Sequence, residues 1–138
     1  MVGAGVAGIK AALDAAEAGV HVYLADIRHH IGGTLSQLEK QFPTNHCGMC
    51  KMLPMVDRDA SGQYCLRKGL FHENIDLRLG TELKSMEGEP GRFEVTLSTR
   101  RACIDPDRCQ GCGACAEVCP VEVPDSFNGG LSKRKAVY

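Results

Sequence analysis

The sequence contains no tryptophan, and aromatic residues make up only 5% of it. Any hydrophobic core must therefore be built from aliphatic side chains. The sequence also lacks an excess of either charge, because its formal net charge is −1. This balance argues against a protein that binds nucleic acid through bulk positive charge. No apolar run approaches the ~20 residues that would span a bilayer, so we expect no membrane span.

Cysteine, by contrast, is abundant, with eight in 138 residues. An even number of cysteines indicates disulfides mainly in small secreted chains. We recognise no export signal here, since the chain opens directly into glycines. The spacing is also uneven, because half of the cysteines lie between Cys109 and Cys119. We therefore expect a cytoplasmic protein whose clustered thiols bind metal.

The clustered thiols have the spacing C-x2-C-x2-C-x3-C and belong to Cys109, Cys112, Cys115 and Cys119. Pro120 follows directly, and this pattern is typical of the [4Fe-4S] ligands of bacterial ferredoxins. Gly111 and Gly113 allow positive φ in the loop, so that it can wrap a cluster. The alternatives are a zinc site and buried thiols, but zinc is usually held by two separated C-x2-C pairs.

The role of Cys119 stays open at this point. In two-cluster ferredoxins the fourth cysteine of such a run ligates the other cluster. The sequence contains no second run. Cys119 therefore either returns to the cluster of its own run or serves a cluster whose remaining ligands lie outside these residues.

A second motif, G-x-G-x-x-G, is formed by Gly3, Gly5 and Gly8. The segment 9–19 after it is rich in Ala and Leu and predicts a helix that ends at Gly19. The segment 20–26 predicts a strand that ends in Asp26, 18 residues after Gly8. This is the order of a dinucleotide-binding unit, in which the glycines approach a pyrophosphate at the helix N-terminus and the acid contacts a ribose hydroxyl.

Two further sequence features bear on the predicted nucleotide site, namely the residues before the glycines and a second pair of glycines. Only Met1 and Val2 precede the glycines, so we expect the first strand of the unit to be absent, the chain to be incomplete and its own affinity for FAD to be weak. The doublet Gly32 and Gly33 follows Asp26, as in flavin-binding two-dinucleotide folds. The doublet favours FAD over NAD.

The middle of the chain is less specific. Residues 34–42 predict a short helix, and Cys47 and Cys50 follow as C-x-x-C. The pair is a redox dithiol beside the flavin, a ligand pair of another cluster together with Cys65, or two buried thiols. Residues 74–80 and 91–100 predict strands, with a turn over 87–91, and together they suggest a small β-meander. The basic stretch 132–138 is interpreted as a solvated end or a link.

The segments 3–26, 31–54, 109–124 and 130–138 resemble, in that order, the HdrA family, the iron–sulfur flavoproteins of heterodisulfide reductases. The resemblance implies an α/β fold, namely a Rossmann-like FAD-binding domain of the thioredoxin-reductase type, incomplete here, with a ferredoxin-type [4Fe-4S] insertion. It implies a partial FAD-binding domain over 1–100 and an iron–sulfur segment over 101–138. Full members are several times longer and continue into a second ferredoxin run.

The resemblance also implies function. FAD would be held by Gly3, Gly5, Gly8, Asp26, Gly32 and Gly33, and a [4Fe-4S] cluster by the four clustered cysteines. The chain would be an oxidoreductase subunit that passes electrons between FAD and clusters, in some members by bifurcation. Its partners would be other heterodisulfide-reductase-like subunits, hydrogenase or formate dehydrogenase subunits, and ferredoxin. Two alternatives remain, a small ferredoxin-like electron carrier and a flavin disulfide reductase that uses Cys47 and Cys50.

Overall fold

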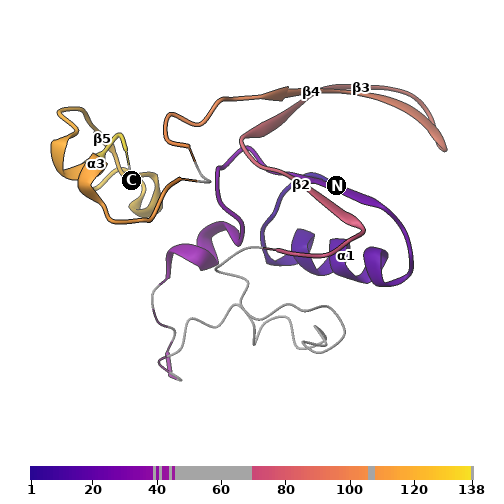
Figure 1. Cartoon of the computed structure of the whole chain (residues 1–138), viewed down its shortest axis with the longest axis horizontal. Helices are drawn as coiled ribbons and strands as arrows, with labels where there is room; N and C mark the ends of the chain where they lie inside the picture. The colour runs from indigo at the N-terminus through magenta and orange to yellow at the C-terminus, as the bar shows by residue number, and fades with distance from the viewer. Residues whose placement is uncertain (39, 41, 44, 46–69, 106–107, 138) are drawn as a thin grey trace. The chain divides into compact units, whose positions relative to one another are not determined.

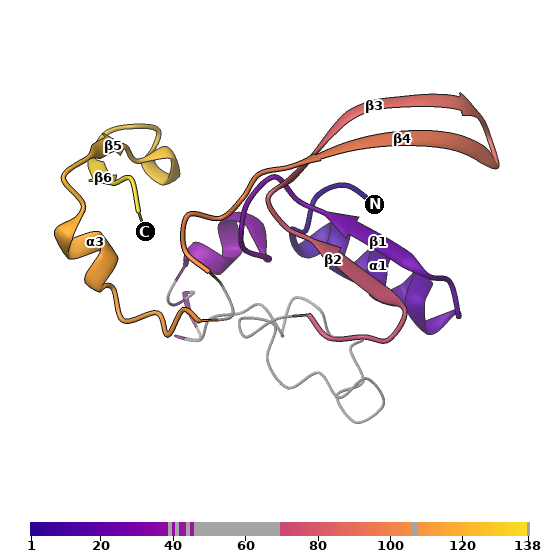
Figure 2. The same ribbon diagram turned by 45° about the horizontal axis from the view of Figure 1, so that its top comes forward.

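The computed structural model describes residues 1–38, 40, 42–43, 45, 70–105 and 108–137. The chain divides into two compact units, Met1–Arg101 and Ala102–Tyr138. Figures 1 and 2 show that the first unit holds a helix, a small sheet and a long hairpin, while the second holds short elements. The described chain is thus a mixed α/β structure, and each unit is treated by itself.

The first unit begins with helix α1 (Val6–Glu17) and strand β1 (Val22–Ala25). The buried residues of α1 recur with the spacing of one helix face and are Ile9, Ala12, Leu13 and Ala16. Gly19 has a φ of +83°, a left-handed conformation that suits a glycine just after a helix. The helix, its end and the strand are confirmed where the sequence predicts them.

The residues before the glycines do take part in the sheet, contrary to our expectation that this strand is absent. Val2 forms a parallel bridge with Ala25. The Ala25 N–H donates to the carbonyl oxygen of Met1 at 2.9 Å, and the Gly3 N–H donates to the carbonyl oxygen of Ala25 at 2.7 Å. The first three residues therefore already occupy the position of the first strand beside β1.

Strand β2 (Ile75–Arg78) pairs in parallel with β1, with Val22 opposite Ile75 and Leu24 opposite Leu77. The prediction that residues 74–80 belong to a β-meander is therefore wrong. These residues extend the sheet that contains β1, because their alternating side chains Ile75 and Leu77 pack against the core of the first unit. The order of the sheet is residues 1–3, then β1, then β2.

Strands β3 (Thr81–Glu89) and β4 (Arg92–Thr99) form an antiparallel hairpin. Glu89 lies opposite Arg92, so the turn consists of Pro90 and Gly91. The predicted turn over 87–91 is thus too long, because pairing continues through Glu87 and Gly88. Between Gly32 and β2 the described chain also contains the 3-10 helix η1 (Gly33–Gln37), which falls partly in the predicted helix 34–42.

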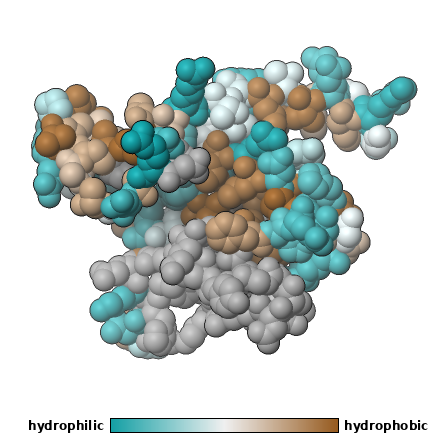
Figure 3. Space-filling model, viewed as in Figure 1, coloured by the Kyte–Doolittle hydropathy of each residue, from teal (hydrophilic) through white to brown (hydrophobic). Residues whose placement is uncertain are grey.

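The hairpin carries apolar side chains on its surface, among them Met86, Phe93, Val95 and Leu97 (Figure 3). Some of them line a groove of about 480 Å³ together with Val2, Tyr23 and other residues of β1. None of the predicted nucleotide or cluster residues lines this groove. The predicted functional residues therefore lie outside this groove.

The core of the first unit lies between α1 and the sheet. Its buried members are aliphatic, as the lack of aromatic residues requires, and are Ala4, Ile9, Ala12, Leu13, Val22, Leu24, Ile31 and Leu70. Ala4 and Ile31 lie directly beside the glycines of the two loops. The packing of this core consequently fixes the backbone of the glycine motifs.

The second unit contains helix α3 (Ala114–Val118), strand β5 (Glu122–Pro124), the 3-10 helix η2 (Ser126–Asn128) and strand β6 (Lys133–Lys135). None of its described residues is buried. Val118 and Leu131 are even 80% and 91% exposed. Since a unit this small has no aliphatic core among these residues, its structure needs another source of stability.

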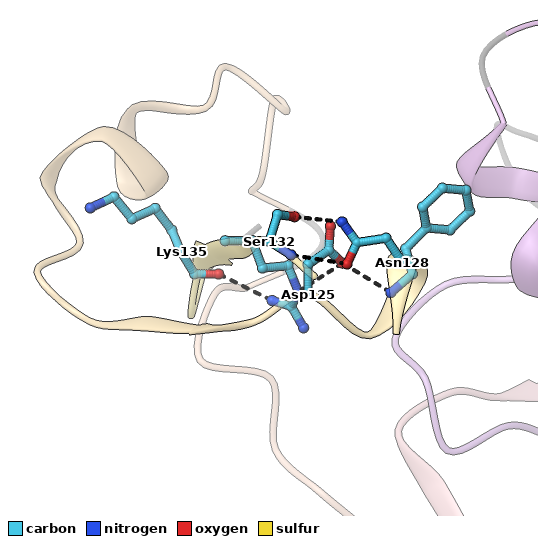
Figure 4. A network of polar contacts seen from close by, with 6 residues as sticks. Asp125, Asn128, Ser132 and Lys135 are labelled. Atoms are coloured by element: carbon cyan, nitrogen blue, oxygen red, sulfur yellow. Dashed lines mark hydrogen bonds and ion pairs between the residues drawn. The ribbon is translucent and has the colours of Figure 1, made fainter. Parts of the chain in front are cut away.

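Part of the basic stretch is structured, because Lys133–Lys135 form strand β6; the interpretation of 132–138 as a solvated end or a link stays a prediction. Strand β6 pairs antiparallel with β5. Polar contacts close the loop between them: the Asp125 carboxylate accepts from the Phe127 N–H at 3.0 Å, and the Asn128 amide donates to Ser132 Oγ at 2.6 Å (Figure 4). Gly129 and Gly130 have positive φ values of 71° and 84°, which the turn between η2 and β6 requires.

No helix within the described ranges is long and apolar enough to cross a membrane.

Candidate functional site

The first candidate site is the loop between residue 2 and α1. Gly8 lies so close to Gly3 that a Cβ at Gly8 would overlap the Gly3 carbonyl oxygen. The third glycine thus allows the helix to approach the strand end. At Gly5, in contrast, a Cβ would meet nothing within 4 Å. The backbone at Gly5 therefore faces open space, from which a ligand can approach it.

Asp26 lies immediately after β1 and is only 8% exposed. Its carboxylate accepts from the Ala4 N–H at 2.6 Å and from the Arg28 N–H at 2.8 Å. These bonds fix the carboxylate beside the glycine loop. Each oxygen keeps further acceptor capacity, so Asp26 can accept hydrogen bonds from a hydroxyl pair as well. The contact from Ala4 was not foreseen, since the sequence gives no signal for which loop N–H an acid will use.

The glycine doublet lies against the same loop. The Gly32 N–H donates to the Ala4 carbonyl oxygen at 2.7 Å. A Cβ on Gly33 would lie 3.4 Å from the Gly5 Cα, and Gly33 has a φ of +59°. Ser36 of η1 donates to the Gly33 carbonyl oxygen at 2.7 Å and so closes the turn. The structure thus brings the predicted residues Gly5, Gly33 and Asp26 to one place.

The chemistry of this place follows from its backbone. The N–H groups of the first turn of α1 have no partner within the helix, and they carry the positive end of its dipole. No acidic side chain lies in that first turn. Such a helix start binds phosphate groups. With a fixed carboxylate beside it, the site suits a nucleotide that offers both a pyrophosphate and ribose hydroxyls.

The second candidate site is the cysteine loop of the second unit. Cys109, Cys112 and Cys115 are exposed. Gly111 and Gly113 have positive φ values of 67° and 78°, as the sequence predicts for a loop that folds around a cluster. Yet no three Cys, His, Asp or Glu side chains in the described part of the chain are placed to hold a metal ion. The structure therefore does not bring the four sulfur atoms together.

A physical reason accounts for this separation. In ferredoxins the four cysteine sulfur atoms are held together by bonds to iron rather than by contacts within the chain. The donor set itself fits a [4Fe-4S] cluster, because it consists of four thiols between residues 109 and 119 with the ferredoxin spacing. The lack of buried side chains among the described residues around it also fits, since a bound cluster supplies the stability that a core would otherwise give.

Cys119 differs from the other three thiols, because the chain folds back around it. Hydrogen bonds with the backbone of Val137 and then of Val121 lower the pKa of the Cys119 thiol, while its partial desolvation acts in the opposite direction. The backbone of Ala136 and the charge of Lys135 lower this pKa further. The surroundings of Cys119 thus favour the thiolate, which is the form that binds metal.

The remaining predicted site residues, Cys47 and Cys50, lie outside the described residues, as does Cys65. Cys103 is described and exposed.

Comparison with known families supports the interpretation of the cysteine loop as an iron–sulfur site. The family model described as "4Fe-4S dicluster domain" matches residues 63–123. The matched range contains the whole run from Cys109 to Cys119, together with Cys65 and Cys103.

Curated relatives match over the whole chain. One is the HdrA protein of the H2/formate:CoB-CoM heterodisulfide,ferredoxin reductase of Methanococcus maripaludis, 44% identical over 138 residues. Another is an HdrA-like protein of Archaeoglobus profundus, 44% identical over 140 residues. The alignments cover 100% of this chain but only 20% and 18% of those relatives. The chain thus spans about a fifth of the length of the curated relatives it matches.

Among solved structures, the crystal structure of L-proline dehydrogenase from P. horikoshii is similar, with a TM-score of 0.50 and 23% sequence identity. The match covers 71% of this chain and 18% of that one. The likeness concerns the fold alone, and it supports the α/β assignment.

Proposed function

Because this chain belongs, over all of its 138 residues, to the HdrA family of heterodisulfide reductase proteins, we propose that it carries electrons between FAD and [4Fe-4S] clusters. The observation that carries the proposal is the meeting of Gly5, Gly33 and Asp26 at the start of α1. The proposed domains are a partial FAD-binding domain of the thioredoxin-reductase type over 1–100 and an inserted ferredoxin-type segment over 101–138.

In the first domain the backbone would hold the cofactor. Gly3 and Gly8 let the loop pass close to α1, and Gly5 leaves its backbone open to a pyrophosphate. Gly32 and Gly33 form the second wall of the site. Asp26, held by the Ala4 and Arg28 N–H groups, would accept hydrogen bonds from ribose hydroxyls. Bound FAD supplies the exchange between electron pairs and single electrons, while these residues only bind and orient it.

In the second domain the four cysteines of the run would hold a [4Fe-4S] cluster, which supplies one-electron transfer. Other residues of this domain would shape the loop that carries the ligands and would favour their thiolate form. Gly111 and Gly113 allow the loop to turn around it. The backbone around Cys119 favours the thiolate that binds iron.

The partners are proposed from the names of the relatives. Those names specify H2 or formate, ferredoxin and the CoB-CoM heterodisulfide. We propose an oxidoreductase subunit that works with other heterodisulfide-reductase-like subunits, with hydrogenase or formate dehydrogenase subunits, and with ferredoxin, in an electron-bifurcating complex.

The proposal is tested by the cofactor content of the full-length protein, purified under anaerobic conditions. We expect flavin, iron and sulfide together, with both structured flavin peaks and a broad iron–sulfur band in the absorption spectrum. A protein with iron and sulfide but no flavin would instead be a small electron carrier and would contradict the proposal. Flavin without iron would contradict it as well.

Asp26→Asn should weaken FAD binding at least about tenfold. An amide presents one acceptor oxygen where the carboxylate presents two, and it lacks the negative charge, so the hydrogen bonds that Asp26 would accept from ribose hydroxyls are weakened by about 1.5–3 kcal/mol. The measurement is a fluorescence titration of the apoprotein with FAD. Asp76→Asn is the matched control, since Asp76 lies on the neighbouring strand β2 and pairs with Arg78. Equal affinities in the two variants would remove Asp26 from the site.

For Cys47 and Cys50 we propose a redox or relay role near the flavin, with cluster ligation together with Cys65 as the alternative. After reduction of the cluster-loaded protein, a free dithiol should be alkylated at both positions, and mild oxidation should crosslink the pair. The measurement is mass mapping of the modified peptides. Protection of both thiols together with Cys65, lost when the metal is chelated, would establish ligation instead.

A further inference from the structure

Strand β6 carries three consecutive cations and lies beside a predicted cluster ligand. The register places Lys135 opposite Glu122 and Lys133 opposite Pro124. Glu122 is the residue of β5 nearest to Cys119 in the chain. Beyond Lys135, the Ala136 N–H donates to the Val121 carbonyl oxygen at 2.9 Å. Residues 135–137 therefore run alongside the segment that contains Cys119.

Contacts of the Cys119 sulfur agree with this placement. Its Sγ lies 3.6 Å from the Val121 carbonyl oxygen. The backbone of Val137 also hydrogen-bonds to this thiol, and the charge of Lys135 favours the thiolate. Of the three cations, Lys135 is thus the one that the hairpin places at the end near the sulfur.

The other cations are placed differently. The Arg134 guanidinium lies 3.9 Å from the Asp125 carboxylate and donates to the Lys135 carbonyl oxygen at 3.1 Å, within the polar network of Figure 4. Lys133 lies on the same face of β6 as Lys135 but two residues further along the hairpin. Lys135 itself contacts Glu122, with 3.3 Å between Nζ and Oε1. A cation and an anion therefore stand together at the end of the hairpin next to Cys119.

We propose that Lys135, opposed by Glu122, sets the reduction potential of the cluster that Cys119 ligates. Reduction adds one negative charge to the cluster, and a nearby cation stabilises that charge while a nearby anion destabilises it. Lys135 thus raises the potential and Glu122 lowers it. This inference rests on the proposed function, because it requires a cluster at the cysteine run.

The test is an anaerobic redox titration of the reconstituted 138-residue chain, followed by EPR of the reduced cluster. At the midpoint potential of the parent, Lys135→Met should lower the ratio of reduced to oxidised cluster about threefold, which is about 28 mV at 59 mV per tenfold change. Glu122→Gln should raise the same ratio. Lys135→Arg should restore the parent's value, and added salt should reduce all of these shifts, since the charges are partly exposed.

Lys133→Met is the matched control, because it removes the same charge from the same strand face. It should change the ratio much less than Lys135→Met does. Equal shifts in the two variants, or a fall of the ratio in Glu122→Gln, would overturn the inference while leaving the cluster in place. If Lys135→Met loses its iron, the Glu122→Gln variant decides the test: a rise in the ratio of reduced to oxidised cluster supports the inference, and a fall overturns it. A parent chain that binds no iron would overturn this inference and the proposed cluster alike.

Discussion

Replacing Gly8 with alanine should abolish FAD retention and destabilise the first unit. The new Cβ would overlap the carbonyl oxygen of Gly3, and both partners in this clash belong to the backbone. Gly3 cannot move freely, since its N–H donates to the Ala25 carbonyl oxygen at 2.7 Å. We expect a loss of about 1–3 kcal/mol in the free energy of unfolding, as for other overpacked sites. The measurements are denaturant unfolding of the first unit and the flavin content of the full-length protein after purification.

Gly5→Ala separates the two effects. A Cβ at Gly5 meets nothing within 4 Å, and its φ of −76° is open to any residue. This variant should therefore unfold like the parent, while its FAD content falls, because the methyl group occupies the approach of the pyrophosphate. Full FAD retention by Gly5→Ala would show that no ligand approaches there. Parent-like stability and FAD content in Gly8→Ala would contradict the close contact itself.

The parts of the fold that could be predicted are those that local patterns determine. The helix face of Ile9, Leu13 and Ala16 follows from a 3.6-residue period, and its end follows from one glycine. The spacing between Gly8 and Asp26 then placed the acid at the end of β1. These features depend on neighbours in the sequence, so the sequence alone carries them.

Partner choice between strands could not be predicted in the same way. The alternating side chains of Ile75, Asp76 and Leu77 suit a parallel and an antiparallel partner equally well. Only the tertiary structure shows that they pair with β1 rather than with the hairpin. The same holds for Val2, whose single bridge to Ala25 is too short to leave a pattern. Long-range pairing also places Lys135 opposite Glu122, which no spacing in the sequence indicates.

The candidate sites differ in the same sense. The proposed nucleotide site is assembled by the chain itself, because the core residues Ala4 and Ile31 hold its loops together. The cysteine run was recognised from spacing alone, but its sulfur atoms are not brought together by contacts among the described residues. We therefore expect the two units to differ in how well they keep their structure when their cofactors are lost. Without FAD the first unit keeps its core, whereas without iron the second unit loses the bonds that would hold its loop.

Replacing Cys112 with alanine should remove most of the iron from the reconstituted 138-residue chain and loosen the second unit. The parent should bind about one four-iron cluster, since it has one complete run. A thiolate in the middle of the loop has no nearby substitute, so we expect iron and sulfide to fall to roughly a quarter of the parent's content or less. Because no described residue of this unit is buried, the loss should spread to the β5–β6 hairpin.

Amide hydrogen exchange measures whether the loss of stability reaches the β5–β6 hairpin. The Asp125 N–H donates to the Ser132 carbonyl oxygen at 2.8 Å, and the Ala136 N–H donates to the Val121 carbonyl oxygen at 2.9 Å. Both N–H groups should exchange at least about tenfold faster in Cys112→Ala, as expected when local opening costs less. The N–H groups of β1 should exchange as in the parent, because the first unit has its own core. Cys103→Ala is the matched control, since Cys103 is equally exposed but lies outside the run. Unchanged iron in Cys112→Ala, or equal losses in both variants, would contradict the assignment of the ligands.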